Sequence, residues 1–197
     1  MRIPPTFYRD LLSGLVGLMV SAQCSLAAQE RAVVDGPVTY VYSTTPAGDL
    51  KAYLFSPPVQ TAHHRRAAIV VFHGGGWTVG EPEWAFPRSR HFTEGGMVAV
   101  AAQYRLADQD SVTPIEAMAD ARAVIRWKRT HADSLDIDPE RIAAYGWSAG
   151  GHLAACAATF ETGASVGAVS SVPNALVLQS PAVSVASDRQ SLRVAGV

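Results

Sequence analysis

A continuous apolar run, AAIVVF from Ala67 to Phe72, leads directly into a histidine and three consecutive glycines, HGGG at residues 73–76. The length and β-branched content of this run are typical of a strand that is buried on both faces of a sheet. Glycine loses more backbone freedom on folding than any other residue, so three in a row indicate that another group must approach this backbone closely. Open α/β sheets bind their ligands at the ends of such strands.

The rest of the chain repeats this pattern of buried strands separated by helices. A short helix is predicted through FPRSRHF, residues 86–92, and further strands are predicted over residues 97–105, 141–145 and 175–178. The alternation is typical of an α/β fold with a mostly parallel sheet and crossover helices on both faces. Before it, the alternating runs TYVYS and KAYLFS flank the turn TPAGD and predict an antiparallel hairpin at one edge.

A capping box predicts where the longest helix begins. Thr113 is the expected N-cap, Pro114 occupies the first helical position, and Glu116 follows three residues after the cap. The helix is predicted to bury one apolar face made by Ile115, Met118, Ala121 and Ile125. Three basic residues lie away from the centre of that face and are interpreted as solvated rather than as nucleic-acid binding: Arg122, Arg126 and Arg129.

The amino-terminal segment has the order of regions found in a secretory signal peptide. Arg2 and Arg9 precede the apolar run LLSGLVGLMV, and the small residues of CSLAAQ follow it. We expect residues 1–28 to be a signal peptide, cleaved after Ala27 or Ala28, and the protein to be exported to the periplasm or the extracellular space. A membrane anchor is disfavoured because the run is shorter than the ~20 residues that a span needs. A lipoprotein site at Cys24 is a weaker alternative.

The composition of the sequence limits the kinds of partner that the protein can bind. The 197-residue chain is 48% hydrophobic and has a formal net charge of −1, which fits one soluble globular domain and disfavours nucleic acid or an anionic membrane surface as a main partner. No stable membrane span is expected after removal of the signal. The adjacent pair His63 and His64 lacks metal-ligand spacing and predicts a surface loop, so no metal or cofactor is expected.

Removal of the signal leaves Cys156 as the one cysteine of the mature sequence. It lies in the small, apolar stretch LAACAA, with no basic or histidine-rich surrounding in the sequence that would lower the pKa of its thiol. We therefore interpret it as a buried inert thiol rather than as a nucleophile.

The sequence G-x-S-x-G occurs once in a strand-to-helix context, as Gly146-Trp147-Ser148-Ala149-Gly150 after the predicted strand over 141–145. This context is that of a nucleophile elbow, in which a strained turn presents the serine hydroxyl above the sheet. The glycines two residues before and after Ser148 then have a steric purpose. An ordinary serine in a βα turn is the alternative.

Together the motifs resemble those of the α/β-hydrolase esterases of the hormone-sensitive-lipase and acetyl-esterase type. The resemblance rests on HGGGW at 73–77, YRLA at 104–107, Asp120, DPERIAAYG at 138–146 and GWSAGGHLA at 146–154, and it covers about residues 40–183. It implies an α/β-hydrolase fold in which the backbone N–H groups of Gly75, Gly76 and Ala149 form an oxyanion hole beside Ser148. His73, Gly74, Trp77, Gly146 and Gly150 would support these motifs.

Backbone without side chains suits this purpose. An acyl-transfer intermediate carries negative charge on one oxygen, and glycines allow two or three N–H groups to approach it within ~3 Å. The resemblance makes His73 a structural residue of its loop rather than the general base. His152 is no better a base, because it lies one helical turn beyond Ser148.

The resemblance also predicts a catalytic acid and a histidine after the serine. The 197 residues contain no histidine after His152, and their only later carboxylates are Glu161 and Asp188. We therefore expect a partial α/β-hydrolase domain over residues 29–197, lacking the last strands of the fold.

Two functions follow from these observations. The first is a secreted serine carboxylic-ester hydrolase acting on short-chain acyl or carbohydrate-acetyl esters, with a small-molecule or carbohydrate ester as its partner. The second is a non-catalytic remnant that binds a ligand or another protein, or that has no activity. In either case the last predicted strand, residues 175–178, could self-associate through an exposed sheet edge.

Overall fold

A computed structural model of the chain describes residues 36–57, 65–107, 112–159 and 168–182. The expected signal peptide, the pair His63 and His64, and the carboxylates of Glu161 and Asp188 lie outside the described residues.

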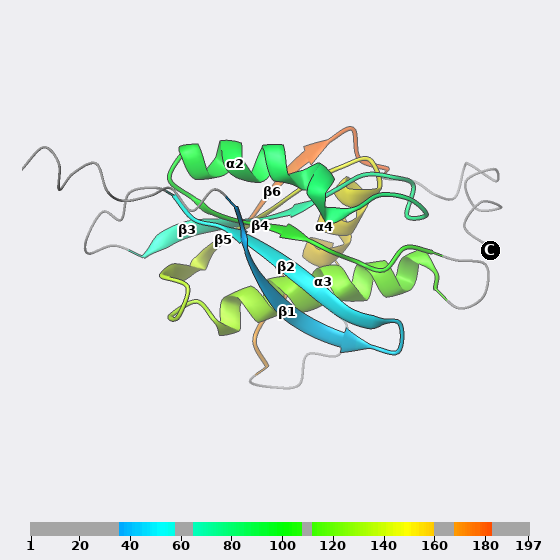
Figure 1. Ribbon diagram of the computed structural model, residues 1–197, viewed down its shortest axis with the longest axis horizontal. Coiled ribbons are helices and arrows are strands. Elements are labelled where there is room, and N and C mark those ends of the chain that lie inside the picture. The colour runs from blue at the N-terminus through cyan, green and yellow to red at the C-terminus, as the bar shows by residue number, and fades with distance from the viewer. Residues whose placement is uncertain (1–35, 58–64, 108–111, 160–167, 183–197) are drawn as a thin grey trace, which may run out of the picture. The chain divides into compact units, whose positions relative to one another are not determined.

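The described residues form a six-stranded sheet in the order β1-β2-β4-β3-β5-β6 (Figure 1). Strands β4, β3, β5 and β6 are parallel to one another, whereas β1 and β2 form an antiparallel hairpin that pairs antiparallel with β4. The predicted mostly parallel sheet with a hairpin at one edge is therefore confirmed. The strand bounds are β1 Val38–Thr45, β2 Gly48–Phe55, β3 Arg66–Phe72, β4 Val98–Ala102, β5 Ile137–Trp147 and β6 Ala175–Gln179.

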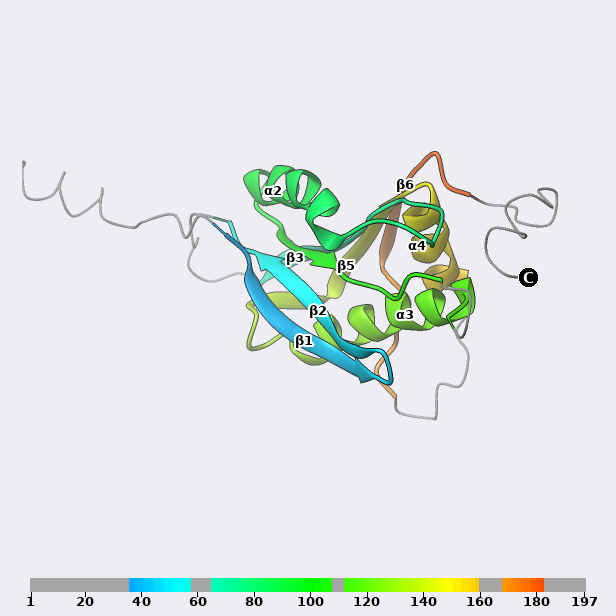
Figure 2. The ribbon, with the colours of Figure 1, turned by 45° about the vertical axis from the view of Figure 1, so that its right-hand side comes forward.

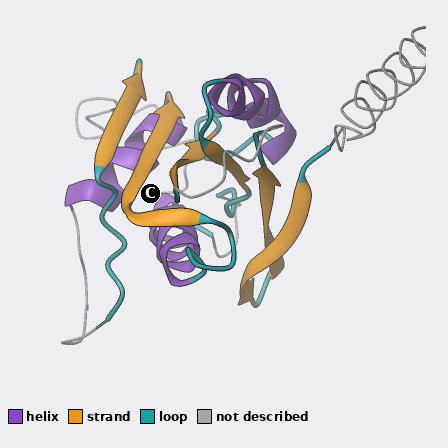
Figure 3. Cartoon of the chain, turned by 90° about the vertical axis from the view of Figure 1, so that its left-hand side faces the viewer, coloured by secondary structure: helices purple, strands orange, loops and turns teal. Residues whose placement is uncertain are grey.

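Helices cover both faces of this sheet (Figures 2 and 3). The short 3-10 helix η1, Pro82–Ala85, runs into α2, Phe86–Glu94, which packs on β2, β3 and β4. The opposite face is covered by α3, Pro114–Thr130, and α4, Ala149–Thr159, which also contact each other. This arrangement is the one that crossover connections between parallel strands produce.

Strands β3 and β4 are buried on both sides, as their continuous apolar runs predict. Val70 and Phe72 belong to the core under α3 and α4, whereas Ile69 and Val71 belong to the core under α2. Because successive side chains of a strand point to opposite faces, one apolar run supplies both cores. Strand β3 therefore lies at the centre of the sheet and delivers the HGGG segment to its carboxyl edge.

The capping box of α3 is present as predicted, but the buried face of the helix is rotated from the expected one. The Thr113 hydroxyl accepts from the Ile115 N–H at 3.2 Å, and the Glu116 carboxylate accepts from the Thr113 N–H at 2.7 Å. Ile115, however, is 64% exposed. The buried residues follow a strict helical period that admits two charged side chains: Ala117, Asp120, Ala121, Val124, Ile125 and Lys128.

Two of the arginines expected to be solvated instead bind backbone carbonyls. Arg126 donates to the carbonyl oxygen of Val169 at 3.0 Å. Arg129 donates to the carbonyls of Pro139, Ser170 and Val172, and to the side-chain oxygen of Asn174. These contacts fasten the segment that leads into β6 onto α3. Sequence position alone could not show the contacts with Val169 and Val172, because these carbonyls lie 43 positions away from the arginines.

Candidate active site

Ser148 occupies the turn between β5 and α4, as the G-x-S-x-G motif predicts. Its φ of 52° lies in the left-handed region, which is unfavourable for a residue with a Cβ. The residue is exposed, and its N–H donates to the carbonyl oxygen of Gln179, at the end of β6, at 3.1 Å. A strained, exposed serine between a strand and a helix is the geometry of a nucleophile elbow.

Steric crowding explains why both flanking positions of this motif are glycine. A Cβ on Gly146 would lie 2.1 Å from the carbonyl oxygen of Gly150, so the turn could not close around it. A Cβ on Gly150 would lie 2.3 Å from the carbonyl oxygen of Phe72 and 2.4 Å from that of His73. The first turn of α4 is therefore in direct backbone contact with the end of β3.

The glycine loop after β3 folds back on itself. The carbonyl oxygen of Gly75 accepts from the N–H groups of Thr78 at 3.2 Å and of Val79 at 3.0 Å. Gly75 and Gly76 have φ values of 125° and 60°, which glycine adopts without steric cost. The nearest atom to a Cβ on Gly76 would be 4.0 Å away, so open space lies beside this residue.

The glycine loop and the serine turn leave the same edge of the sheet. Strands β3 and β5 are parallel neighbours, with Phe72 paired opposite Gly146. The HGGG segment begins one residue after Phe72, and Ser148 follows two residues after Gly146. The predicted oxyanion loop and nucleophile are thus brought together, while the roles of the Gly75, Gly76 and Ala149 N–H groups as oxyanion donors remain a prediction.

His73 is built into its own loop. Its Nδ1 lies 2.6 Å from the carbonyl oxygen of Gly74. Because a carbonyl oxygen can only accept a hydrogen bond, the neutral ring carries its proton on Nδ1. Tyr104 stacks on the ring at 4.4 Å between centroids and donates its hydroxyl hydrogen to the His73 carbonyl at 2.9 Å. Burial lowers the pKa of His73. These contacts support the structural role that the resemblance implies.

His152 is also committed elsewhere. Its Nδ1 lies 2.7 Å from the carbonyl oxygen of Ala182, and its Nε2 lies 3.3 Å from the Sγ atom of Cys156. The Cys156 thiol therefore does have a histidine neighbour, one helical turn earlier in α4. Burial nevertheless raises the pKa of the thiol, with the charge of Arg122 opposing this effect, so the thiol stays protonated at neutral pH.

Trp77 closes the glycine loop against the segment after β4. Its carbonyl oxygen accepts from the Ala107 N–H at 2.6 Å, and its indole contacts the His152 ring edge-on at 5.3 Å. Its φ is 64°, and its buried Nε1 has no hydrogen-bond partner among the described residues. The motif residues HGGGW and YRLA are therefore joined in the structure as well as in the sequence pattern.

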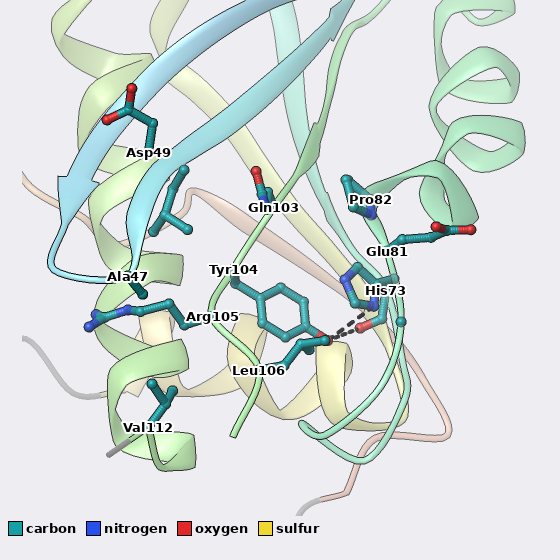
Figure 4. Close-up of a pocket in the computed structure, with 12 residues that line it drawn as sticks. Ala47, Asp49, His73, Glu81, Pro82, Gln103, Tyr104, Arg105, Leu106 and Val112 are labelled. Carbon is teal, nitrogen blue, oxygen red and sulfur yellow. Dashed lines mark hydrogen bonds between the residues drawn. The ribbon is translucent and has the colours of Figure 1, made fainter. Parts of the chain in front are cut away.

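A cavity of about 360 Å³ lies on the β4 side of this loop (Figure 4). Its lining includes the His73 ring, the Tyr104 ring, Leu50 and Leu106, but it does not include Ser148. Asp49, Glu81 and Arg105 are the charged lining residues. The Arg105 guanidinium is paired with the Asp120 carboxylate at 2.7 Å, so the two remaining charges are negative.

The described residues show neither a metal site nor a membrane span. No group of three or more His, Cys, Asp and Glu residues in the described ranges could hold a metal ion. In the same ranges no helix combines the length and the apolar composition needed to cross a bilayer.

Comparison with known proteins identifies the family. The BD-FAE family matches residues 54–183, which include the glycine loop, the serine turn and every strand from β3 to β6. The chain belongs to the BD-FAE family. This places it in the family of α/β-hydrolase esterases of the hormone-sensitive-lipase and acetyl-esterase type, as the motifs implied.

Individual relatives of this BD-FAE chain agree. Carboxylesterase NlhH of Mycobacterium tuberculosis is 35% identical over 109 residues, which are 54% of this chain and 33% of that protein. The arylesterase of Saccharolobus solfataricus is 32% identical over 108 residues, 54% of this chain and 34% of its own length. The structure of esterase Est2 from Thermogutta terrifontis matches with a TM-score of 0.68 and 40% identity, over 75% of this chain and 54% of Est2. The chain thus spans about a third of the curated relatives and about half of Est2.

Some residues of the site were not singled out from the sequence. Tyr104 holds His73 from 31 positions away, and Trp147 packs on Gly74, yet neither was named as a site residue. The YRLA motif marked Tyr104 indirectly. Nothing in the sequence showed which side of the elbow the Trp147 ring would occupy.

Proposed function

We propose that this chain is a serine carboxylic-ester hydrolase whose nucleophile is Ser148. The observation that carries the proposal is the position of Ser148: exposed, at a positive φ, and next to a glycine loop that touches its helix through Gly150. A turn this strained persists only where the surrounding structure enforces it, and such turns concentrate at functional sites.

The proposed reaction has two steps. The Ser148 Oγ attacks the ester carbonyl carbon, a C–O bond forms, and the carbonyl electron pair moves onto its oxygen, which the N–H groups of Gly75, Gly76 and Ala149 stabilise. Collapse of this intermediate breaks the bond to the alcohol, which leaves with the serine proton. Water then attacks the acyl-enzyme, releases the carboxylic acid and returns the proton to Ser148.

A general base must move the proton in both steps, and the described histidines near the elbow do not serve. His73 binds the Gly74 carbonyl through Nδ1, His152 uses both of its ring nitrogens, and none of these contacts involves Ser148. The 197 residues contain no histidine after His152. The base is therefore not supplied by the described residues around the serine, and catalysis by these residues rests on the oxyanion hole and substrate binding.

The proposed substrates are small esters with short acyl groups, including acetyl esters of carbohydrates. Esterase Est2, which is similar to this chain, has been solved with propionate and with butyrate bound. We also propose that the protein is exported, on the support of the signal-like order of residues 1–28.

Covalent labelling separates this proposal from a non-catalytic binding role. Esterase Est2 has been solved phosphorylated by paraoxon, and a fluorophosphonate probe tests the same chemistry in this chain. We expect slow labelling confined to the peptide that contains Ser148, abolished in Ser148→Ala and retained in Ser134→Ala, which removes an exposed hydroxyl elsewhere. A folded chain that remains unlabelled would favour the non-catalytic role.

A further inference from the structure

Gly74 lies directly against the indole ring of Trp147. A Cβ on Gly74 would lie 2.7 Å from the indole Nε1, 2.8 Å from Cδ1 and 3.2 Å from the Trp147 carbonyl oxygen. Gly74 is not among the glycines with a positive φ, so its backbone conformation does not require glycine. Residue 74 lacks a side chain because the indole occupies the space that a side chain would fill.

Trp147 is fixed by strand pairing and by the core under α2. It is the last residue of β5, where it pairs with Gln179 of β6, and it comes immediately before Ser148. Its half-buried ring packs on the core under α2, with the Tyr145 ring 6.2 Å away between centroids. The ring is therefore a fixed support on the same strand that presents the serine.

Two hydrogen bonds to backbone carbonyls of the glycine loop hold it to a different part of the fold. Tyr104 binds the His73 carbonyl, and Ala107 binds the Trp77 carbonyl, so both tie the loop to the segment after β4. Toward the serine, the loop meets the backbone of Gly150, the ring of Trp147 and, through Trp77, the ring of His152. Of these contacts, the one with Trp147 is made by a side chain next to Ser148 and lies directly before Gly75 and Gly76.

We propose that Trp147 is a positioning residue that sets the distance between the Ser148 hydroxyl and the N–H groups of Gly75 and Gly76. This inference rests on the proposed function of those groups. Oxyanion donors act only when they lie about 3 Å from the developing charge, and a displacement of about 1 Å can cost ~10²-fold in rate. The Trp147 ring contacts Gly74, the residue before the first donor, Gly75. A change in the ring would therefore displace that donor.

A double-mutant cycle tests the contact itself. The variants Gly74→Ala, Trp147→Ala and the combination are compared in the full 197-residue chain by the amide NMR signals of ¹⁵N-labelled glycine. We expect Gly74→Ala to move the signals of Gly75 and Gly76 strongly in the native background and several-fold less in Trp147→Ala, where the methyl group has room. Equal shifts in both backgrounds would overturn the proposal.

The Ser148-dependent hydrolysis of p-nitrophenyl acetate gives the functional part of the test. Because the described rings of His73 and His152 are engaged away from Ser148, we expect the rate to depend mainly on the oxyanion hole and so to report the loop position. We expect kcat to fall about 10-fold or more in Trp147→Ala, with KM changed less than about 3-fold, and to fall less in Trp147→Phe. Ile115→Ala, which removes an apolar side chain of α3 that is 64% exposed, is the control and should leave kcat unchanged.

The two readouts separate the two hypotheses. Coupled glycine signals without any Ser148-dependent hydrolysis would support the positioning contact and refute the proposed function. Hydrolysis that depends on Ser148 but is unchanged in Trp147→Ala would refute the positioning role alone. If Gly74→Ala does not fold, the order of kcat among the native chain, Trp147→Phe and Trp147→Ala decides, and equal values overturn the proposal.

Discussion

The Arg105 side chain binds the carboxylate of Asp120 through two nitrogens, Nε at 2.9 Å and Nη2 at 2.7 Å. The Arg105 backbone N–H donates to the same carboxylate at 3.0 Å. The pair joins the YRLA segment after β4 to the middle of α3. Tyr104 precedes Arg105 and donates its hydroxyl hydrogen to the His73 carbonyl, so the ion pair also helps to fix the position of the glycine loop.

Loss of this carboxylate should destabilise the fold. The Asp120 side chain is 4% exposed and that of Arg105 is 20% exposed, so Asp120→Asn leaves a partly buried guanidinium without its counterion. We expect a loss of about 2–4 kcal/mol in the free energy of unfolding, measured by urea denaturation. The control is Asp133→Asn, which breaks an ion pair with Arg65 whose side chains are 83% and 52% exposed, and it should cost under ~1 kcal/mol. Equal losses in the two variants would contradict this prediction.

The second prediction concerns the buried amine of Lys128. Its side chain is fully buried on α3 and has the Val98 carbonyl at 3.3 Å, and burial lowers the pKa of Lys128 from 10.5 to about 7. Between these two values the unfolded chain binds a proton that the folded chain does not, so stability rises with pH. The expected slope from this group is about 1.4 kcal/mol per pH unit.

Denaturation at several pH values between 7 and 10 measures that slope. Lys128→Met should lose it and should be more stable than the native chain, most of all near pH 7, where the cost of the buried charge is greatest. The exposed Lys51 provides the control, since Lys51→Met should keep the slope of the native chain. A slope that survives in Lys128→Met would show that another group causes it.

The third prediction reverses a common expectation for glycine in a helix. Gly150 lies in the first turn of α4, where replacing glycine by alanine ordinarily stabilises a helix by up to ~1 kcal/mol. Here the new Cβ would lie 2.3 Å from the Phe72 carbonyl oxygen, so we expect Gly150→Ala to lower the melting temperature strongly. Gly36→Ala, at a position where nothing lies within 4 Å of a Cβ, should change it little. A stable Gly150→Ala chain would mean that β3 and α4 separate more easily than their contact indicates.

How far the sequence predicts this molecule depends on the range of the interactions. The runs that form β3 and β4, the capping box of Thr113 and Glu116, and the turn at Ser148 are set by neighbours within a few residues, and each was predictable. The rotation of α3 was not, because Asp120 is buried by its pairing with Arg105, 15 positions earlier. Contacts between distant segments decided the parts of the structure that the sequence pattern left open.

The candidate site divides in the same way. Motifs identify the glycine loop and the serine because each is a local backbone shape with a sequence signature. The contact between Gly74 and Trp147 has no such signature, since it joins the loop after β3 to the end of the neighbouring strand β5. The structure reveals such a contact as a glycine that has no positive φ but whose Cβ would clash with a neighbour. Neither property can be read from the sequence.

The fourth prediction is that the chain associates through β6. Among the described residues this strand pairs with β5 alone, all five of its residues are exposed, and Leu176, Val177 and Leu178 are 39%, 45% and 39% exposed. It carries no charge within it, whereas the opposite edge strand β1 has a bulge between Val41 and Ser43 that hinders pairing. Sedimentation should show association that weakens in Val177→Lys and persists in Val41→Lys. Equal weakening in both variants would contradict the role of β6.

The last prediction concerns the activity of the 197-residue chain. A serine hydroxyl is a poor nucleophile unless a base takes its proton, and loss of a triad member typically leaves only about 10³-fold catalysis over water. The His73 and His152 rings are engaged away from Ser148, and His91 lies exposed on α2, 3.9 Å from the Glu94 carboxylate. We therefore expect feeble hydrolysis of p-nitrophenyl acetate that disappears in Ser148→Ala and does not change in His91→Gln. A rate per chain that increases with protein concentration would indicate that a histidine from a second chain reaches the serine. Robust activity that depends on Ser148 and is independent of concentration would instead show that a histidine of the same chain acts as the base, contrary to the contacts described here.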